Sequence, residues 1–123
     1  MAEDNVVEIK ERVNPIVLYF DDRNETYTLE FDRDAIRFAE GRGFDIEDVG
    51  KHPMTKLPEL FWYAFRMHHK AVSREKADRI LFDDLGGMPD GMAERLGALY
   101  ADPHKALHNE SNKPKNPHLT VEM

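Results

Sequence analysis

The chain has 123 residues, of which 41% are hydrophobic and 33% are charged, and its formal net charge is −7. This length fits a single domain with a modest core, and the absence of cysteine excludes disulfides, thiolate metal ligands and a cysteine nucleophile. The first fifty residues hold six Lys and Arg against fourteen Asp and Glu, which disfavours nucleic acid as a partner because phosphate binding needs clustered cations. No apolar run approaches the roughly 20 residues of a membrane span, and the acidic N-terminus has no secretory h-region. We therefore expect a protein that stays in the cytoplasm, with neither nucleic acid nor a membrane as its partner.

The first predicted element is a β-hairpin over residues 15–31, which follows a polar lead-in at residues 1–14. Its first strand is rich in β-branched and aromatic residues, and a cluster of turn-forming residues comes next. In the second strand the apolar Tyr27, Leu29 and Phe31 alternate with polar residues, as in a half-buried strand. An isolated hairpin is marginally stable in water, so we expect helices of the same chain or another subunit to cover its apolar face.

A small bundle of about four helices is expected after the hairpin, because apolar residues recur at helical spacing between capping residues and glycines. The second helix has the strongest pattern, with Thr55 as its cap and Pro58 in its first turn. Strands followed by helices predict a single α+β domain over residues 15–102. The composition then changes to Pro, His and Lys, which predicts a flexible tail over residues 103–123. The expected helices cover residues 33–40, 56–71, 74–85 and 89–101.

The polar residues suggest little chemistry. His68 and His69 are adjacent, so on a helix they point about 100° apart and do not easily share one metal ion. His104 and His108 have the spacing of a helical metal pair, but they lie in the expected tail. The nucleophile-elbow and phosphate-loop motifs are not found. We therefore expect no metal, no cofactor and no enzymatic activity.

A run of aromatic residues in the second predicted helix has the character of a binding surface. Five consecutive apolar residues, from Phe61 to Phe65, cannot all face one core, and Trp, Tyr and Phe are the residue types that anchor interfaces. The alternative is that a small domain uses all of them internally. Aromatic residues of the hairpin are second choices. The candidate protein-binding residues are Phe61, Trp62, Tyr63 and Phe65, followed by Tyr19, Tyr27 and Phe31.

The order of elements carries a family resemblance. An alternating strand, Tyr27-Thr28-Leu29-Glu30-Phe31, runs directly into a capped helix at Asp32, and an aromatic helix ends in His68-His69-Lys70. The segment Ser73-Arg74-Glu75-Lys76-Ala77, a Gly-Gly break and a closing helix with Leu96-Gly97-Ala98-Leu99-Tyr100 complete the order. Over roughly residues 15–101, this order resembles the small tail assembly chaperones of long-tailed bacteriophages and prophages.

The resemblance implies a role without catalysis in the cytoplasm of a bacterial host. Proteins of this kind bind the long, largely helical tape-measure protein before the tail tube forms around it. They keep it soluble and are absent from the finished tail. Many are also made in a longer, frameshifted form whose extension engages the tail tube protein, and the expected tail at residues 103–123 lies where such an extension would begin.

The residues themselves are compatible with this role. A tape-measure chain presents apolar helical faces that would aggregate if left bare, and an aromatic groove can hold such a helix. Repeated copies can bind weakly and still hold the client through multivalency, and the edge of the hairpin offers a route to self-association. Two alternatives stay open: a virion structural or connector subunit that remains in the particle, and a small enzyme with a concave polar pocket.

Overall fold

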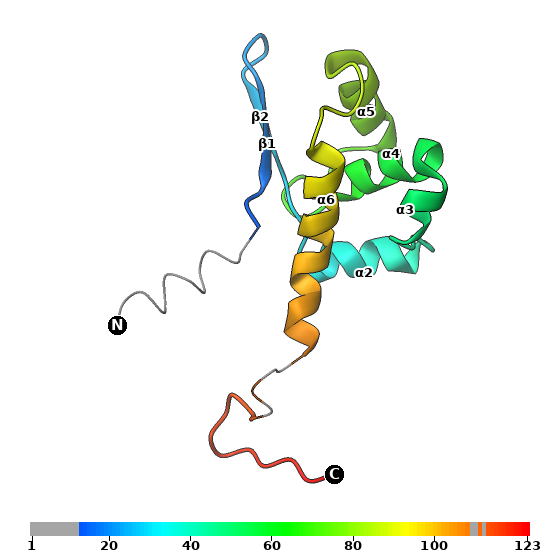
Figure 1. Cartoon of the computed structure of the whole chain (residues 1–123). Coiled ribbons are helices and arrows are strands. Elements are labelled where there is room, and N and C mark those ends of the chain that lie inside the picture. Colours follow the sequence, from blue (N-terminus) through cyan, green and yellow to red (C-terminus); the bar gives the residue numbers. More distant parts are fainter. Residues whose placement is uncertain (1–12, 109–110, 112) are drawn as a thin grey trace.

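The computed structural model describes residues 13–108, 111 and 113–123, and in Figure 1 a β-hairpin stands along one side of a group of helices. The predicted α+β class is confirmed, with strands first and helices after them. The first twelve residues of the expected lead-in lie outside the described residues. The elements are β1 (Ile16–Phe20), β2 (Glu25–Leu29), α2 (Arg33–Gly41), α3 (Asp48–Lys51), α4 (Pro53–Tyr63), α5 (Arg74–Arg79), the π-helical turn η1 (Ile80–Asp84), α6 (Met92–Ala101) and the 3-10 helix η2 (Asp102–Leu107).

The hairpin has the alternation that the second strand predicts. β1 and β2 pair antiparallel, with Leu18 opposite Tyr27 and Ile16 opposite Leu29. Leu18, Tyr27 and Leu29 are buried, whereas the residues between them face outward. In the turn, Asn24 has a φ of 51°, a left-handed conformation that Asn tolerates better than most residues. The strands therefore present one apolar face to the helices.

Two hydrogen bonds attach the hairpin to the chain that follows α4. The N–H of Glu30 donates to the carbonyl oxygen of Ala64 at 3.0 Å, and the N–H of Thr28 donates to Nε2 of His69 at 2.9 Å. α4 in turn contacts α2, α3, α5 and α6. The helices are thus arranged around α4, and the turn at residues 64–69 links them to β2.

The core is built largely from aromatic rings that meet edge to face. Phe65 lies against Tyr27 with ring centroids 5.6 Å apart and against Phe61 at 5.2 Å, and Phe31 lies against Tyr100 at 5.1 Å. Edge-to-face geometry is favourable because the positive edge of one ring meets the negative face of the next. Side chains from the hairpin, α4 and α6 therefore share a single cluster.

The predicted range of the central helix, residues 56–71, is wrong at both ends. α4 begins at Pro53, whose fixed φ suits the first turn of a helix, so Thr55 is not the cap and Pro58 lies inside the helix. The helix ends at Tyr63 because the carbonyl of the next residue and the imidazole of His69 accept the N–H groups of the hairpin.

Two predicted helix starts are confirmed by their caps. Oδ1 of Asp32 accepts the N–H of Ala35 at 2.8 Å, and α2 covers the expected residues 33–40. Oγ of Ser73 accepts the N–H of Lys76 at 3.1 Å, which caps α5. A side-chain oxygen at this position satisfies one of the donors that the first helical turn leaves without a partner.

The third predicted helix, residues 74–85, changes its winding part-way. After α5, the N–H of Leu85 donates to the carbonyl of Ile80 at 2.8 Å, five residues back, which defines the π-helical turn η1. The wider turn keeps Ile80 and Leu81 in the core while Phe82 faces solvent. The predicted range 74–85 is close to the observed range of α5 and η1, but the prediction of one regular α-helix is wrong.

The last predicted helix, residues 89–101, starts late and is continued beyond its expected end. α6 begins at Met92 because Gly91, with a φ of 84°, is in the left-handed region. The chain then continues as the 3-10 helix η2, so the first residues of the expected tail at 103–123 are helical.

Truncation of the ring at the centre of this core should be costly. We expect Phe65→Ala to lower the free energy of unfolding by about 3–5 kcal/mol, because Phe65 has no exposed surface and its removal leaves a cavity. Urea denaturation followed by the fluorescence of Trp62 measures the change. The control is Met54→Ala, since Met54 is 91% exposed and should cost no more than about 0.5 kcal/mol. Equal losses in both variants would contradict this view of the core.

Candidate protein-binding surface

The outward side of β1 and β2 carries no charged side chain. We call it the outer face: Val17 and Tyr19 from β1, and Thr26 and Thr28 opposite them on β2. Tyr19 is 72% exposed and Val17 is 37% exposed. Since a third of the chain consists of charged residues, a patch with an exposed aromatic ring and no charge is a distinct feature of its surface.

The two edges of the hairpin differ. The N–H of Thr28 donates to His69 and therefore points away from β1. Val17 lies opposite Thr28 in the antiparallel pair. In such a pair both residues direct their backbone groups the same way relative to the ladder, so the N–H and C=O of Val17 point away from β2. By alternation the same holds for Tyr19. The N–H and C=O groups of Val17 and Tyr19 form what we call the open edge, since no other backbone group within the described ranges bonds to them. The opposite edge, along Thr28 and Glu30, is covered by the turn at residues 64–69.

The imidazole that covers β2 is held in its neutral form. Burial, with a smaller contribution from neighbouring His68, lowers the pKa of His69 from its usual 6.5. Its Nε2 accepts the N–H of Thr28, so the ring proton must sit on Nδ1. The His69 ring also lies 5.1 Å from that of Tyr27. Protonation of Nε2 would remove the acceptor, so this link depends on a neutral histidine.

The adjacent histidine makes a separate contact with the hairpin. Nε2 of His68 lies 2.9 Å from Oε1 of Glu30, at a partly exposed position. The adjacent pair thus contacts the residues around the end of β2 with both of its rings. Among the residues that the structure describes, no three His, Asp or Glu side chains are grouped to hold a metal ion.

Five of the seven residues predicted to bind a partner belong to the core. They are at least nine-tenths buried, so they have almost no surface to offer while the domain is folded. Tyr19 lies on the outer face, and Trp62 is half-buried, with its Nε1–H donating to the carbonyl of Val72 at 3.0 Å. The structure therefore brings together most of the predicted residues, but inside the molecule. The buried five are Phe61, Tyr63, Phe65, Tyr27 and Phe31.

The surroundings of Trp62 include arginines that the sequence reasoning did not single out. The Arg66 guanidinium lies 3.9 Å from the ring centroid of Phe38, and that of Arg42 lies 5.3 Å from the Trp62 ring. Phe38 lies in α2, and Arg42, four residues later, directly follows the last residue of this helix with its guanidinium 5.6 Å from the Phe38 ring. This spacing is the signal in the sequence that could have revealed them. Such stacking orders the guanidinium groups on the aromatic surface.

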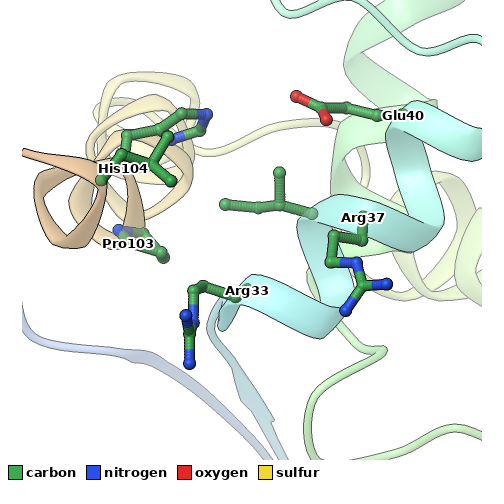
Figure 2. Close-up of a pocket in the computed structure, with 7 residues that line it drawn as sticks. Arg33, Arg37, Glu40, Pro103 and His104 are labelled. Carbon is green, nitrogen blue, oxygen red and sulfur yellow. The ribbon is translucent and has the colours of Figure 1, made fainter.

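A shallow hollow of about 260 Å³ lies between α2 and η2. Arg33, Arg37 and Glu40 of α2 line it together with Pro103 and His104 of η2. Figure 2 shows Glu40 directed towards His104, whereas the two arginine side chains point to one side of the hollow. Ile36 and Leu107 complete its lining and make part of it apolar. The imidazole of His104 is tied to the backbone, since its Nδ1 lies 3.0 Å from the carbonyl oxygen of Tyr100. A hollow of this size can take one or two apolar side chains beside a charged rim.

Comparison with known proteins places the chain in a family. Residues 1–123 match a family described as a domain of unknown function, DUF5055. The chain belongs to this family. No curated protein and no solved structure matches the chain. Within the described part of the chain, every helix is too short or too polar to cross a membrane.

The His69 contact should make stability depend on pH. Between pH 6.5 and the lowered pKa of folded His69, the unfolded chain binds a proton that the folded chain excludes. Stability should therefore fall as the pH falls through this range. In His69→Gln, whose side-chain oxygen can still accept the N–H of Thr28, this part of the pH dependence should be lost.

Urea denaturation at pH 7.5 and at pH 5.0 compares the two proteins. The matched control is His118→Gln, in the exposed terminal segment. A pH dependence that is unchanged in His69→Gln would show that burial of this imidazole does not govern the acid side of the stability profile.

Proposed function

We propose that this protein is a phage tail assembly chaperone, which binds the tape-measure protein and keeps it soluble in the cytoplasm of the bacterial host. The observation that supports this proposal is the outer face of the hairpin. It places an exposed Tyr19 and a partly exposed Val17 on an uncharged surface of an otherwise highly charged, acidic chain. The resemblance in the order of elements adds to this, while the family itself is described without a function.

The outer face has the chemistry for contacts with apolar helices. A tyrosine ring buries a large area with few rotatable bonds, and its hydroxyl can hydrogen-bond at the margin of a contact. The two threonines of this face add methyl groups without charge. Each copy would bind a short stretch of the client weakly, and many copies along one client would act together. The client could then be released as tail tube subunits arrive.

The remaining charge fits the same role. A formal charge of −7 keeps a complex of chaperone and client soluble, because like-charged copies repel one another at long range. In this proposal the protein breaks and forms no covalent bond and needs no cofactor. A longer frameshifted form, which the resemblance implies, would engage the tail tube protein through its extension.

One alternative has an observation in its favour. The open edge of β1 leaves backbone groups of Val17 and Tyr19 without partners within the described ranges, as in a subunit that is completed by its neighbours in a permanent assembly. A connector subunit of this kind would remain in the particle. Mass spectrometry of purified particles separates the two functions, because a chaperone should be missing and a connector subunit should be present.

Co-expression with a tape-measure fragment tests the contact surface. We expect the double variant Tyr19→Ala/Thr26→Lys to lower the affinity for the fragment about tenfold, equivalent to about 1.4 kcal/mol. It removes the ring and places a charge on the outer face. The measurements are the soluble fraction of the fragment and its co-purification with the chain.

The control for this experiment is Met54→Lys, which adds the same charge at an exposed position on α4. This variant should keep the fragment as soluble as the unmodified chain does. If the outer-face variant folds normally and protects the fragment equally well, the outer face is not the binding surface. If the unmodified chain fails to protect the fragment, the proposed function itself is wrong.

A further inference from the structure

Within the strand itself, the open edge of β1 lacks the charge, the proline and the bulge that often prevent strand pairing. Isolated edge strands in natural proteins carry a lysine, a proline or a bulge. β1 reads Ile-Val-Leu-Tyr-Phe over residues 16–20, without charge, proline or glycine, and it pairs with β2 in continuous register. The nearest proline, Pro15, lies directly before the strand. This edge therefore has the composition of a strand that pairs with another one.

The edge is complementary to a second copy of itself. In an antiparallel pair, residues that direct their backbone groups at each other exchange two hydrogen bonds. If Val17 of one copy lies opposite Tyr19 of the second copy, then Tyr19 of the first copy lies opposite Val17 of the second. Each of these two pairs can form two backbone hydrogen bonds. Leu18 then lies opposite Leu18 of the second copy, on a two-fold axis. Pairing with β2 already directs the backbone groups of Val17 and Tyr19 towards the open edge, so this register needs no change in the hairpin.

The side chains agree with this register on both faces. On the outer face, the β-branched Val17 would lie beside the aromatic Tyr19 of the second copy, a favourable type of cross-strand pair. On the inner face, Ile16 would lie beside Phe20 of the second copy. Ile16 and Phe20 are each half-buried in one chain, so the pairing covers apolar surface that the single domain leaves partly exposed.

The paired segment is limited to β1 itself, because the chain enters the hairpin turn at residues 21–24. β1 carries no charged side chain, so the pairing places no two charges of the strands opposite each other.

We propose that two copies of this chain associate through β1 in this register, forming a four-stranded antiparallel sheet in the order β2-β1-β1-β2. Such an interface is isologous, since the same surface is used twice. Five residues per strand make a small interface, so we expect a dimer that dissociates on dilution in the micromolar range. The two outer faces become one continuous uncharged surface. This inference does not depend on the proposed function, since it concerns the chain alone.

Sedimentation of the full chain across a wide concentration range tests the association. The unmodified chain should shift from monomer to dimer. Val17→Lys, at a position that is 37% exposed, should weaken the dimer at least about tenfold, because it places a lysine on the pairing edge. The double variant Val17→Lys/Tyr19→Glu should recover much of the loss, because lysine of one copy then lies beside glutamate of the second copy.

Chemical cross-linking tests the register. Because the chain has no cysteine, single cysteines can be placed without interference. An equimolar mixture of Val17→Cys and Tyr19→Cys chains, treated with a short bis-maleimide, should give clearly more than the statistical twofold excess of the mixed product over either product between identical chains. A mixture of Val17→Cys and Thr26→Cys is the control, because Thr26 lies one strand farther from the open edge.

Three results would overturn the proposal. The first is a full chain that stays monomeric at every concentration. This holds even if a variant without residues 1–12 dimerises, because the edge would then not be available in the full chain. The second is a dimer that Val17→Lys leaves unchanged. The third is a mixed cross-link that does not exceed the statistical twofold excess, which would place the contact in another register or on another surface.

Discussion

The structure depends on the way the turn at residues 64–69 satisfies the backbone of the hairpin. A two-stranded hairpin is marginal alone, and its N–H groups at Thr28 and Glu30 would be costly to bury without acceptors. The carbonyl of Ala64 and the imidazole of His69 supply these acceptors. Because the acceptors lie directly after α4, the same turn that ends this helix also joins the strands to the helices and shields one edge of the sheet.

Sequence reasoning succeeded where the signal is local. The alternation of Tyr27, Leu29 and Phe31 reveals which side of β2 is buried, and Asp32 and Ser73 reveal the starts of two helices through their caps. It failed at the end of α4, where helical periodicity continues past Tyr63. The bond that decides this point joins His69 to a residue forty-one positions earlier, and no local pattern contains that information.

For the candidate binding surface, too, local sequence patterns were not sufficient. The run from Phe61 to Phe65 suggested a binding site, but α4 is surrounded by other helices and buries Phe61 and Tyr63. Phe65, in the turn after α4, is buried as well. β1 is apolar at every position, so its own sequence does not reveal which residues face outward. Pairing with the alternating β2 decides this, and it places Tyr19 on the outside together with Val17, which the sequence analysis did not select.

The unequal edges of the hairpin limit what it can build. Growth of a sheet into a fibril needs two free edges on each molecule, one to receive a strand and one to offer it onward. Here the segment from Ala64 to His69 bonds to Thr28 and Glu30, so when a strand joins β1, this part of the β2 edge is already occupied and opposes further growth of the sheet. An unprotected, hydrophobic strand is thereby tolerated without the danger of open-ended polymerisation.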